Sequence, residues 1–204
     1  MDMPNPPPQG RGALRQARRL LRLAALGLVT LLLGPPAKLS SHLPRALASW
    51  GRRYRRWAFR TWCRACLRIA GVRVEREGRP PERPFFLVAN HLSYLDIFVL
   101  GADLSDAVFV AKHEVADWPM VGMLARAVET IFINRADLPD LMRVNGEVEA
   151  ALDRGRSVIM FPEGTSTPGL RVERFMSPVL DPPARRAMPV HAATLHYRTT
   201  PSDP

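Results

Sequence analysis

A histidine and a carboxylate five residues apart are the side chains best placed to do chemistry in this sequence. Asn90-His91-Leu92-Ser93-Tyr94-Leu95-Asp96 directly follows the apolar run 85–89. If His91 lies in a turn after a buried strand and Asp96 in the first helical turn, the carboxylate can reach back and orient the imidazole as a general base. The alternative is structural. Ser93 and Asp96 also have the spacing of a helix-capping box, which would make His91 an ordinary turn residue.

Three further polar groups follow apolar, strand-like runs. Lys112 follows residues 107–111, Arg135 follows 130–133, and the loop Glu163-Gly164-Thr165-Ser166 follows 157–161. In α/β folds the carboxyl ends of strands carry the chemistry. One base, two cations and this loop suit a site that deprotonates a hydroxyl beside a phosphate-bearing substrate. Taken singly, Arg135 could be a surface charge, Lys112 an ion-pair partner, and the loop an ordinary turn.

The elements that must position these groups begin near residue 72, where short apolar runs alternate with helical segments, as is typical of an α/β domain. A clear helix is predicted between the third and fourth strands, with Asp137 as N-cap, Pro139 in the first turn and Gly155 after its end. The strands are expected at 85–89, 107–111, 130–133, 157–161 and 189–195.

The positive charge lies ahead of this domain. Residues 1–80 hold 17 Lys and Arg against three acidic residues, a net charge of +14, whereas residues 81–204 have a net charge of −4. Residues 1–12 are Pro-rich and are predicted to be a disordered tail. The apolar run Leu23–Leu33 stops at Gly34-Pro35-Pro36 and is shorter than the roughly 20 residues of a full bilayer span. A secretory signal peptide is the alternative interpretation of this run.

A second basic segment, 43–69, interleaves arginines with aromatic residues. Trp50, Tyr54 and Trp57 have helical spacing, and Trp with Arg suits the lipid head-group layer. The alternatives are a solvated helix that packs its aromatics into the core, and a nucleic-acid site, which explains the adjoining apolar run less well. Residues 13–71 are therefore predicted to be basic membrane-anchoring helices. Cys63 and Cys66 have no second Cys or His pair nearby, so we expect reduced thiols on one helix face and no zinc site.

Taken together, the motifs resemble the glycerolipid acyltransferase family, whose best-known members acylate lysophosphatidic acid (1-acyl-sn-glycerol-3-phosphate). Residues 90–96 match its His-x4-Asp block, 129–135 its Gly-x-x-Phe-x-x-Arg block, 161–166 its Phe-Pro-Glu-Gly-Thr block, and 188–191 resemble its Val-Pro block. The resemblance covers about residues 80–198. It implies an α/β fold with a mixed sheet flanked by helices, preceded by a membrane-associated two-helix motif.

The resemblance also implies a reaction. A fatty acyl group would pass from acyl-CoA or acyl-carrier protein to the hydroxyl of a lysolipid, first of all 1-acylglycerol-3-phosphate, giving phosphatidic acid. His91 would be the base and Asp96 would orient it. Glu163 would hydrogen-bond a hydroxyl or brace Arg135. The acceptor head group would be held by Lys112, Arg135, Gly164, Thr165 and Ser166.

The expected partners are the lysolipid, the acyl donor and the membrane, without nucleic acid, metal or further cofactor. The expected location is the cytoplasmic face of a bacterial inner membrane, with residues 13–71 as the anchor. A membrane-bound esterase and a non-catalytic membrane-binding protein are the rival functions.

Two positions depart from the family pattern. Glu129 stands where the family has Gly, and is expected to place a negative charge at the mouth of the acceptor site. Residues 165–167 read Thr-Ser-Thr and lack the family's Arg, and so one phosphate-binding cation. Both leave room for another acceptor, such as a lyso-aminolipid. The sequence stops soon after the last strand, so we expect a C-terminally truncated or partial domain.

Overall fold

The computed structural model describes residues 9–118, 121–134 and 137–198. Short 3-10 helices at Ser40–His42, Arg45–Leu47, His113–Asp117 and Ser177–Leu180 join the main elements. The α-helices are α1 (Gln9–Leu39), α2 (Ala48–Ala70), α3 (Leu95–Asp103), α4 (Val121–Ala127), α5 (Leu138–Asp153) and α6 (Asp181–Arg185). The strands are β1 (Phe86–Ala89), β2 (Val108–Lys112), β3 (Ile131–Ile133), β4 (Val158–Met160) and β5 (Val190–Ala193).

The five strands form one sheet in the order β3-β2-β4-β1-β5. The α/β fold expected from the sequence is confirmed, and each observed strand overlaps the run predicted for it. The expected mixed sheet differs in one respect, since all four strand pairings are parallel. The physical reason is the connections. Every pair of consecutive strands is joined by a crossover that contains a helix, and such crossovers lead to parallel strands.

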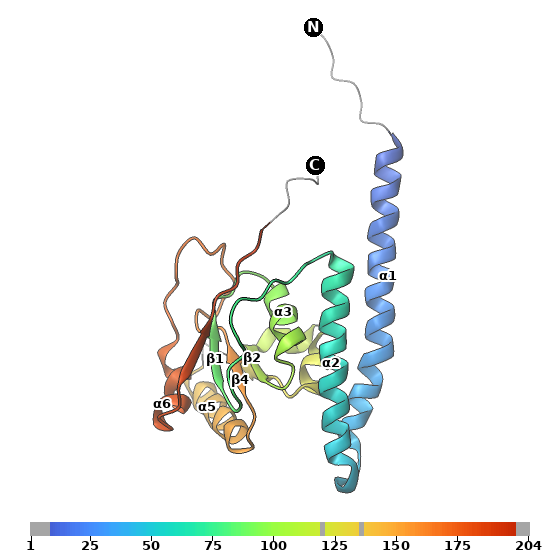
Figure 1. Ribbon diagram of the computed structural model, residues 1–204. Coiled ribbons are helices and arrows are strands. Elements are labelled where there is room, and N and C mark those ends of the chain that lie inside the picture. Colours follow the sequence, from blue (N-terminus) through green and yellow to red (C-terminus); the bar gives the residue numbers. More distant parts are fainter. Residues whose placement is uncertain (1–8, 119–120, 135–136, 199–204) are drawn as a thin grey trace.

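Side chains alternate between the two faces of the sheet, so each strand contributes to two cores. In β1, Leu87 and Ala89 pack in the core covered by α2, α3 and α4, whereas Phe86 packs in the core covered by α5. Figure 1 shows the two-helix unit α1–α2 on one side of the sheet and α5 on the other. The helix predicted between the third and fourth strands is α5. It begins after Asp137 and ends two residues before Gly155.

The N-terminal pair, α1 and α2, runs side by side in opposite directions, and α1 projects beyond the end of α2 (Figure 1). The first turn of α1 includes residues 9–12, which were predicted to belong to a disordered tail. Residues 1–8 lie outside the described part. The helix also continues through Pro35 and Pro36 instead of stopping at Gly34. Packing is the reason, because Gly34 lies against Met123 and Leu124 of α4 and Ala37 is buried.

By length and composition alone, residues 14–42 could cross a membrane, and only 17% of their most apolar window is buried in the protein.

Both interpretations of the second basic helix describe part of α2. Trp50 and Trp57 are more than half exposed, whereas Phe59 and Trp62 are buried in the core of the α/β domain. A domain boundary after residue 71 therefore cuts through a shared core. The approach of α2 to α3 is so close that a Cβ at Gly101 would lie 2.8 Å from Sγ of Cys63.

Candidate active site

The turn after β1 brings His91 against Asp96 in the first turn of α3. Nδ1 of His91 lies 2.7 Å from Oδ2 of Asp96. The Asp96 side chain is fully buried, whereas 14% of the His91 side chain is exposed. The two side chains therefore meet as the sequence analysis expects, with the imidazole between a buried carboxylate and the surface.

The same carboxylate also organises the start of α3. The backbone N–H groups of Leu92 and Ser93 donate to Oδ2 of Asp96 at 2.7 and 3.0 Å, and the Leu95 N–H donates to Oγ of Ser93 at 3.2 Å. These are bonds of the capping type, so the structural alternative is also partly present. One carboxylate both shapes the turn and holds the histidine.

Sequence reasoning missed a third member of this cluster. The hydroxyl of Tyr197 donates to Oδ1 of Asp96 at 2.5 Å. The backbone just before it is fixed by Asn90, whose side chain exchanges two hydrogen bonds with the backbone of Leu195, at 3.0 and 2.7 Å. Tyr197 lies 101 residues from Asp96, and no spacing rule connects them.

The hydrogen bonds decide the charge of Asp96. Burial acts to raise the pKa of its carboxyl, but bonds from His91, the Ser93 amide, Tyr197 and the Leu92 amide outweigh burial and hold the pKa below its ordinary value. An ionised carboxylate can only accept, so Nδ1 of His91 must carry the proton toward Asp96. The other ring nitrogen, Nε2, is then the basic one.

The loop after β4 forms a wall beside the histidine. The Phe161 ring stacks on the imidazole with centroids 4.2 Å apart, and the Thr167 N–H donates to the carbonyl of His91 at 2.9 Å. This is possible because β4 pairs directly with β1. Within the described residues the ring makes no hydrogen bond through Nε2, which leaves that nitrogen available to a substrate.

The predicted binding loop lies in this wall. Glu163 is half-buried, and its Oε2 accepts a hydrogen bond from the Glu173 N–H at 3.3 Å. Gly164 turns the chain with a φ of 74° and is buried, whereas Thr165 and Ser166 are exposed. The structure thus brings His91, Asp96 and residues 163–166 together at the carboxyl ends of the strands.

Of the two predicted cations, the described residues include Lys112. Lys112 ends β2, two strands from β1, and so about 10 Å away across the sheet. Its side chain is mostly exposed and its ammonium pairs with Glu114 at 2.7 Å, as the ion-pair alternative predicts. Arg135 lies outside the described residues.

Glu129 lies at the amino ends of the strands, whereas the histidine lies at their carboxyl ends. Its expected place at the acceptor mouth is therefore wrong. It precedes β3, and its carboxylate pairs with Arg156 at 2.5 Å and Arg55 at 3.3 Å. Its φ of 64° is in the left-handed region, which accounts for the family's Gly here. Strand direction is the reason for the correction, because residues before a parallel strand lie at its amino edge.

In residues 9–118, 121–134 and 137–198, no group of three or more His, Cys, Asp or Glu side chains is placed to hold a metal ion. Cys63 and Cys66 are free thiols, both buried on one face of α2.

Comparison with known proteins gives the family. The acyltransferase family model matches residues 71–191, more than half of the chain. The chain belongs to the acyltransferase family. A lyso-ornithine lipid O-acyltransferase of Pseudomonas aeruginosa is 35% identical over 91% of this chain and 71% of its own length. The enzyme of the same name from Rhodobacter capsulatus is 45% identical over 55% of this chain and 40% of its own length.

A solved structure supports the same family assignment. The crystal structure of the 1-acyl-sn-glycerophosphate acyltransferase from Thermotoga maritima matches with a TM-score of 0.63 and 27% identity. The match covers 85% of this chain and 73% of the other. With the Rhodobacter relative, the aligned part spans only 40% of that protein's length.

Proposed function

We propose that this protein transfers a fatty acyl group from a thioester to the hydroxyl of a lysolipid. The observation that carries the proposal is the buried Asp96 carboxylate bonded to Nδ1 of a partly exposed histidine, whose Nε2 makes no hydrogen bond within the described residues. Membership of the acyltransferase family supports the reaction class.

The geometry suggests how the reaction would proceed. Nε2 of His91 takes the proton of the acceptor hydroxyl. At the same time the hydroxyl oxygen attacks the thioester carbonyl carbon and forms the ester C–O bond. The C–S bond then breaks, and the departing thiolate takes the proton from His91. Asp96 balances the positive charge that the ring carries in between. Positioned proton transfer of this kind contributes about 10²–10⁴ in rate.

Two acceptors have support. The motif blocks and the Thermotoga structure favour 1-acylglycerol-3-phosphate, giving phosphatidic acid. The Pseudomonas and Rhodobacter relatives, and the missing Arg after Thr165, favour a lyso-aminolipid such as lyso-ornithine lipid. Thr165 and Ser166 are exposed in the loop after β4, which lies beside the histidine. They are the proposed head-group contacts for either acceptor, and Glu163 would accept a hydrogen bond from an acceptor hydroxyl.

The remaining assignments belong to the same proposal. The donor is acyl-CoA or acyl-carrier protein, no metal or further cofactor takes part, and the protein works at the cytoplasmic face of the membrane. The long apolar helix α1 supports a membrane location. Lys112, at the same edge of the sheet, is kept as a more distant contact for an anionic head group or donor. Arg135 is kept as a head-group contact on the strength of its motif alone.

The test is an acylation assay. Membranes containing the full chain are incubated with labelled acyl-CoA or acyl-carrier protein and with lysolipids that have and lack a head-group phosphate. His91→Ala should abolish the diacyl product and leave the protein in the membrane. His42→Ala, which changes an exposed histidine between α1 and α2, should retain full activity.

The rivals predict other results. Free fatty acid released without any acceptor would indicate the esterase. Absence of both activities in the wild-type protein would contradict catalysis and favour a membrane-binding role. Loss of membrane association in His91→Ala would show that the substitution impairs folding.

A further inference from the structure

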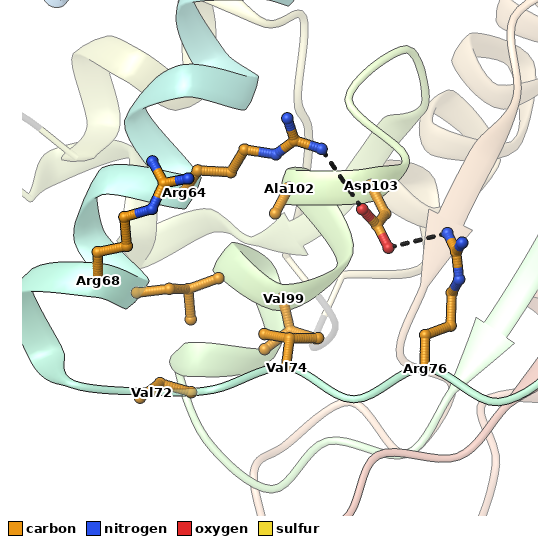
Figure 2. Close-up of a pocket in the computed structure, with 9 residues that line it drawn as sticks. Arg64, Arg68, Val72, Val74, Arg76, Val99, Ala102 and Asp103 are labelled. Carbon is orange, nitrogen blue, oxygen red and sulfur yellow. Dashed lines mark hydrogen bonds and ion pairs between the residues drawn. The ribbon is translucent and has the colours of Figure 1, made fainter.

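A recess separate from the His91–Asp96 pair opens where α2, α3 and the segment after α2 meet (Figure 2). Its volume is about 390 Å³, which lies inside the range of roughly 300–1,000 Å³ typical of ligand sites. None of the site residues described above lines it. Asp103, which lines the recess, follows Asp96 by seven residues on α3, so the two lie about 10 Å apart along the helix axis.

The rim of the recess is cationic. Figure 2 shows Arg64 and Arg68 extending from α2 on one side and Arg76 reaching in from the other. Asp103 pairs with Arg76 at 3.1 Å and with Arg64 at 3.8 Å. The recess therefore has three guanidinium groups and one carboxylate, a net charge of +2, and the carboxylate pairs with two of the three. In the described part of the chain, Arg68 has no ion-pair partner.

The floor of the recess is apolar. Leu67 and Ala102 are buried beneath it, and the side chains of Val72, Val74 and Val99 lie together below the arginines (Figure 2). Val74 remains 44% exposed, although it is a large aliphatic residue. Guanidinium groups above an exposed aliphatic floor fit a ligand that has a phosphate next to a hydrocarbon chain.

The position of the recess points to the membrane as the source of that ligand. Nη2 of Arg22 on α1 lies 3.7 Å from where a Cβ would stand at Gly71, the residue that ends α2. On either side of Arg22, Leu21 and Leu23 are 70% and 64% exposed. The recess therefore opens at the level where α1 presents leucines that a bilayer would cover.

We propose that this recess binds the head group of an anionic phospholipid of the membrane, with its phosphate on Arg64 and Arg68 and the start of an acyl chain on the valine floor. This lipid is neither the acceptor nor the donor, so the proposal goes beyond acyl transfer. An acidic protein partner fits less well, because the charges surround a hollow with an aliphatic base.

The test is a titration of the full chain in a neutral detergent with dihexanoylphosphatidylglycerol and, separately, dihexanoylphosphatidylcholine. The wild-type protein should bind the anionic lipid more tightly. The double variant Arg64→Gln/Arg68→Gln should weaken that binding about tenfold, as expected for loss of charge-assisted hydrogen bonds. Arg73→Gln removes one positive charge from the segment just after α2, at an exposed residue outside the recess, and should bind as the wild type does.

Several results would overturn the proposal. An equal loss in Arg73→Gln would mean a diffuse charge effect, and equal binding of both lipids would remove the role of the head-group charge. Full competition by inorganic phosphate at the same concentration would indicate a simple anion site. If lysophosphatidic acid displaced the bound lipid over the same concentration range in which it is turned over as a substrate, the recess would be part of the acceptor site. His91→Ala should bind the lipid normally, so a failure of the catalytic proposal does not affect this test.

Discussion

At the scale of single residues, the candidate site depends on how one buried carboxylate is held. Asp96 accepts from the His91 ring, from two backbone amides and from the Tyr197 hydroxyl. These donors keep it ionised in a place where burial alone would favour the neutral acid. We therefore propose that Tyr197 positions the histidine through its hydrogen bond to Asp96.

Tyr197→Phe should lower kcat by about tenfold, the typical effect of losing a hydrogen bond to a charged group. The pKa of Asp96 lies below its ordinary value. The carboxylate is therefore ionised at any pH above that ordinary value, and it is protonated only as the pH falls through the lower, folded-state pKa. Removing a donor raises this pKa, so the loss of activity on acidification should begin at a higher pH. The kcat/KM profile against pH measures the shift.

Tyr94→Phe is the matched control for that variant. It removes a hydroxyl two residues before Asp96, from an exposed ring that packs edge-to-face against Trp118. Its pH profile should match that of the wild type. An unshifted profile in Tyr197→Phe, with lower thermal stability alone, would mean that Tyr197 only holds the fold.

Glu129→Gln tests the corrected position of this side chain. Because the Arg156–Glu129–Arg55 cluster lies at the edge of the sheet away from His91, the relative rates with phosphate-bearing and phosphate-free acceptors should not change. Stability should fall by about 1 kcal/mol or less, since the carboxylate is partly solvated. A changed acceptor preference would contradict the assignment.

The stability loss in Glu129→Gln should also depend on pH. Burial acts to raise the Glu129 pKa, but Arg156 and Arg55 outweigh it, so the pKa lies below its ordinary value. Its contribution is therefore present at neutral pH and disappears as pH falls through the folded-state pKa. Melting curves of variant and wild type should converge on acidification.

At the scale of elements, the sequence predicts more of the sheet than of the site. Apolar runs locate all five strands. For β1 to β4 the reason is burial on both faces, which leaves a nearly continuous apolar signal in a parallel sheet, whereas β5 is an exposed edge strand with an apolar sequence. The His91–Asp96 pair is also predictable, since both residues lie in one turn. Tyr197 and the true place of Glu129 are not predictable in this way, because they depend on strand order and direction, which no local pattern encodes.

The contact between α2 and α3 is an element-scale feature that substitution can test. A Cβ at Gly101 would lie 2.8 Å from Cys63 and 2.9 Å from Phe59, so Gly101→Ala should destabilise the protein by about 1–3 kcal/mol through overpacking. Gly146→Ala on α5 meets nothing within 4 Å and should instead stabilise by up to about 1 kcal/mol. Thermal unfolding in detergent measures both. Equal melting temperatures would show that α2 and α3 are not tightly packed.

At the scale of the whole molecule, α1 carries eight exposed leucines, more exposed large apolar side chains than any other described element. Leu28 and Leu32 are 58% and 62% exposed. Replacing both with Asn should move a large share of the protein from the membrane to the soluble fraction, because about 1.5–3 kcal/mol is lost for each large apolar side chain kept from a lipid environment. Met142→Asn, at a 74% exposed position on α5, should leave the distribution unchanged. Equal redistribution in both variants would contradict a membrane role specific to α1.

The shared core of α2 and the sheet has a consequence for how the protein can be divided. Phe59, Trp62 and Leu67 are buried against residues of β1 and α3, and Trp62 also donates a hydrogen bond to Thr30 of α1. A fragment beginning at Val72 would leave this face of the domain open to water and prone to aggregation. The helices that would meet the membrane and the domain that would carry the chemistry thus form one cooperative folding unit, and neither can be exchanged as an independent module.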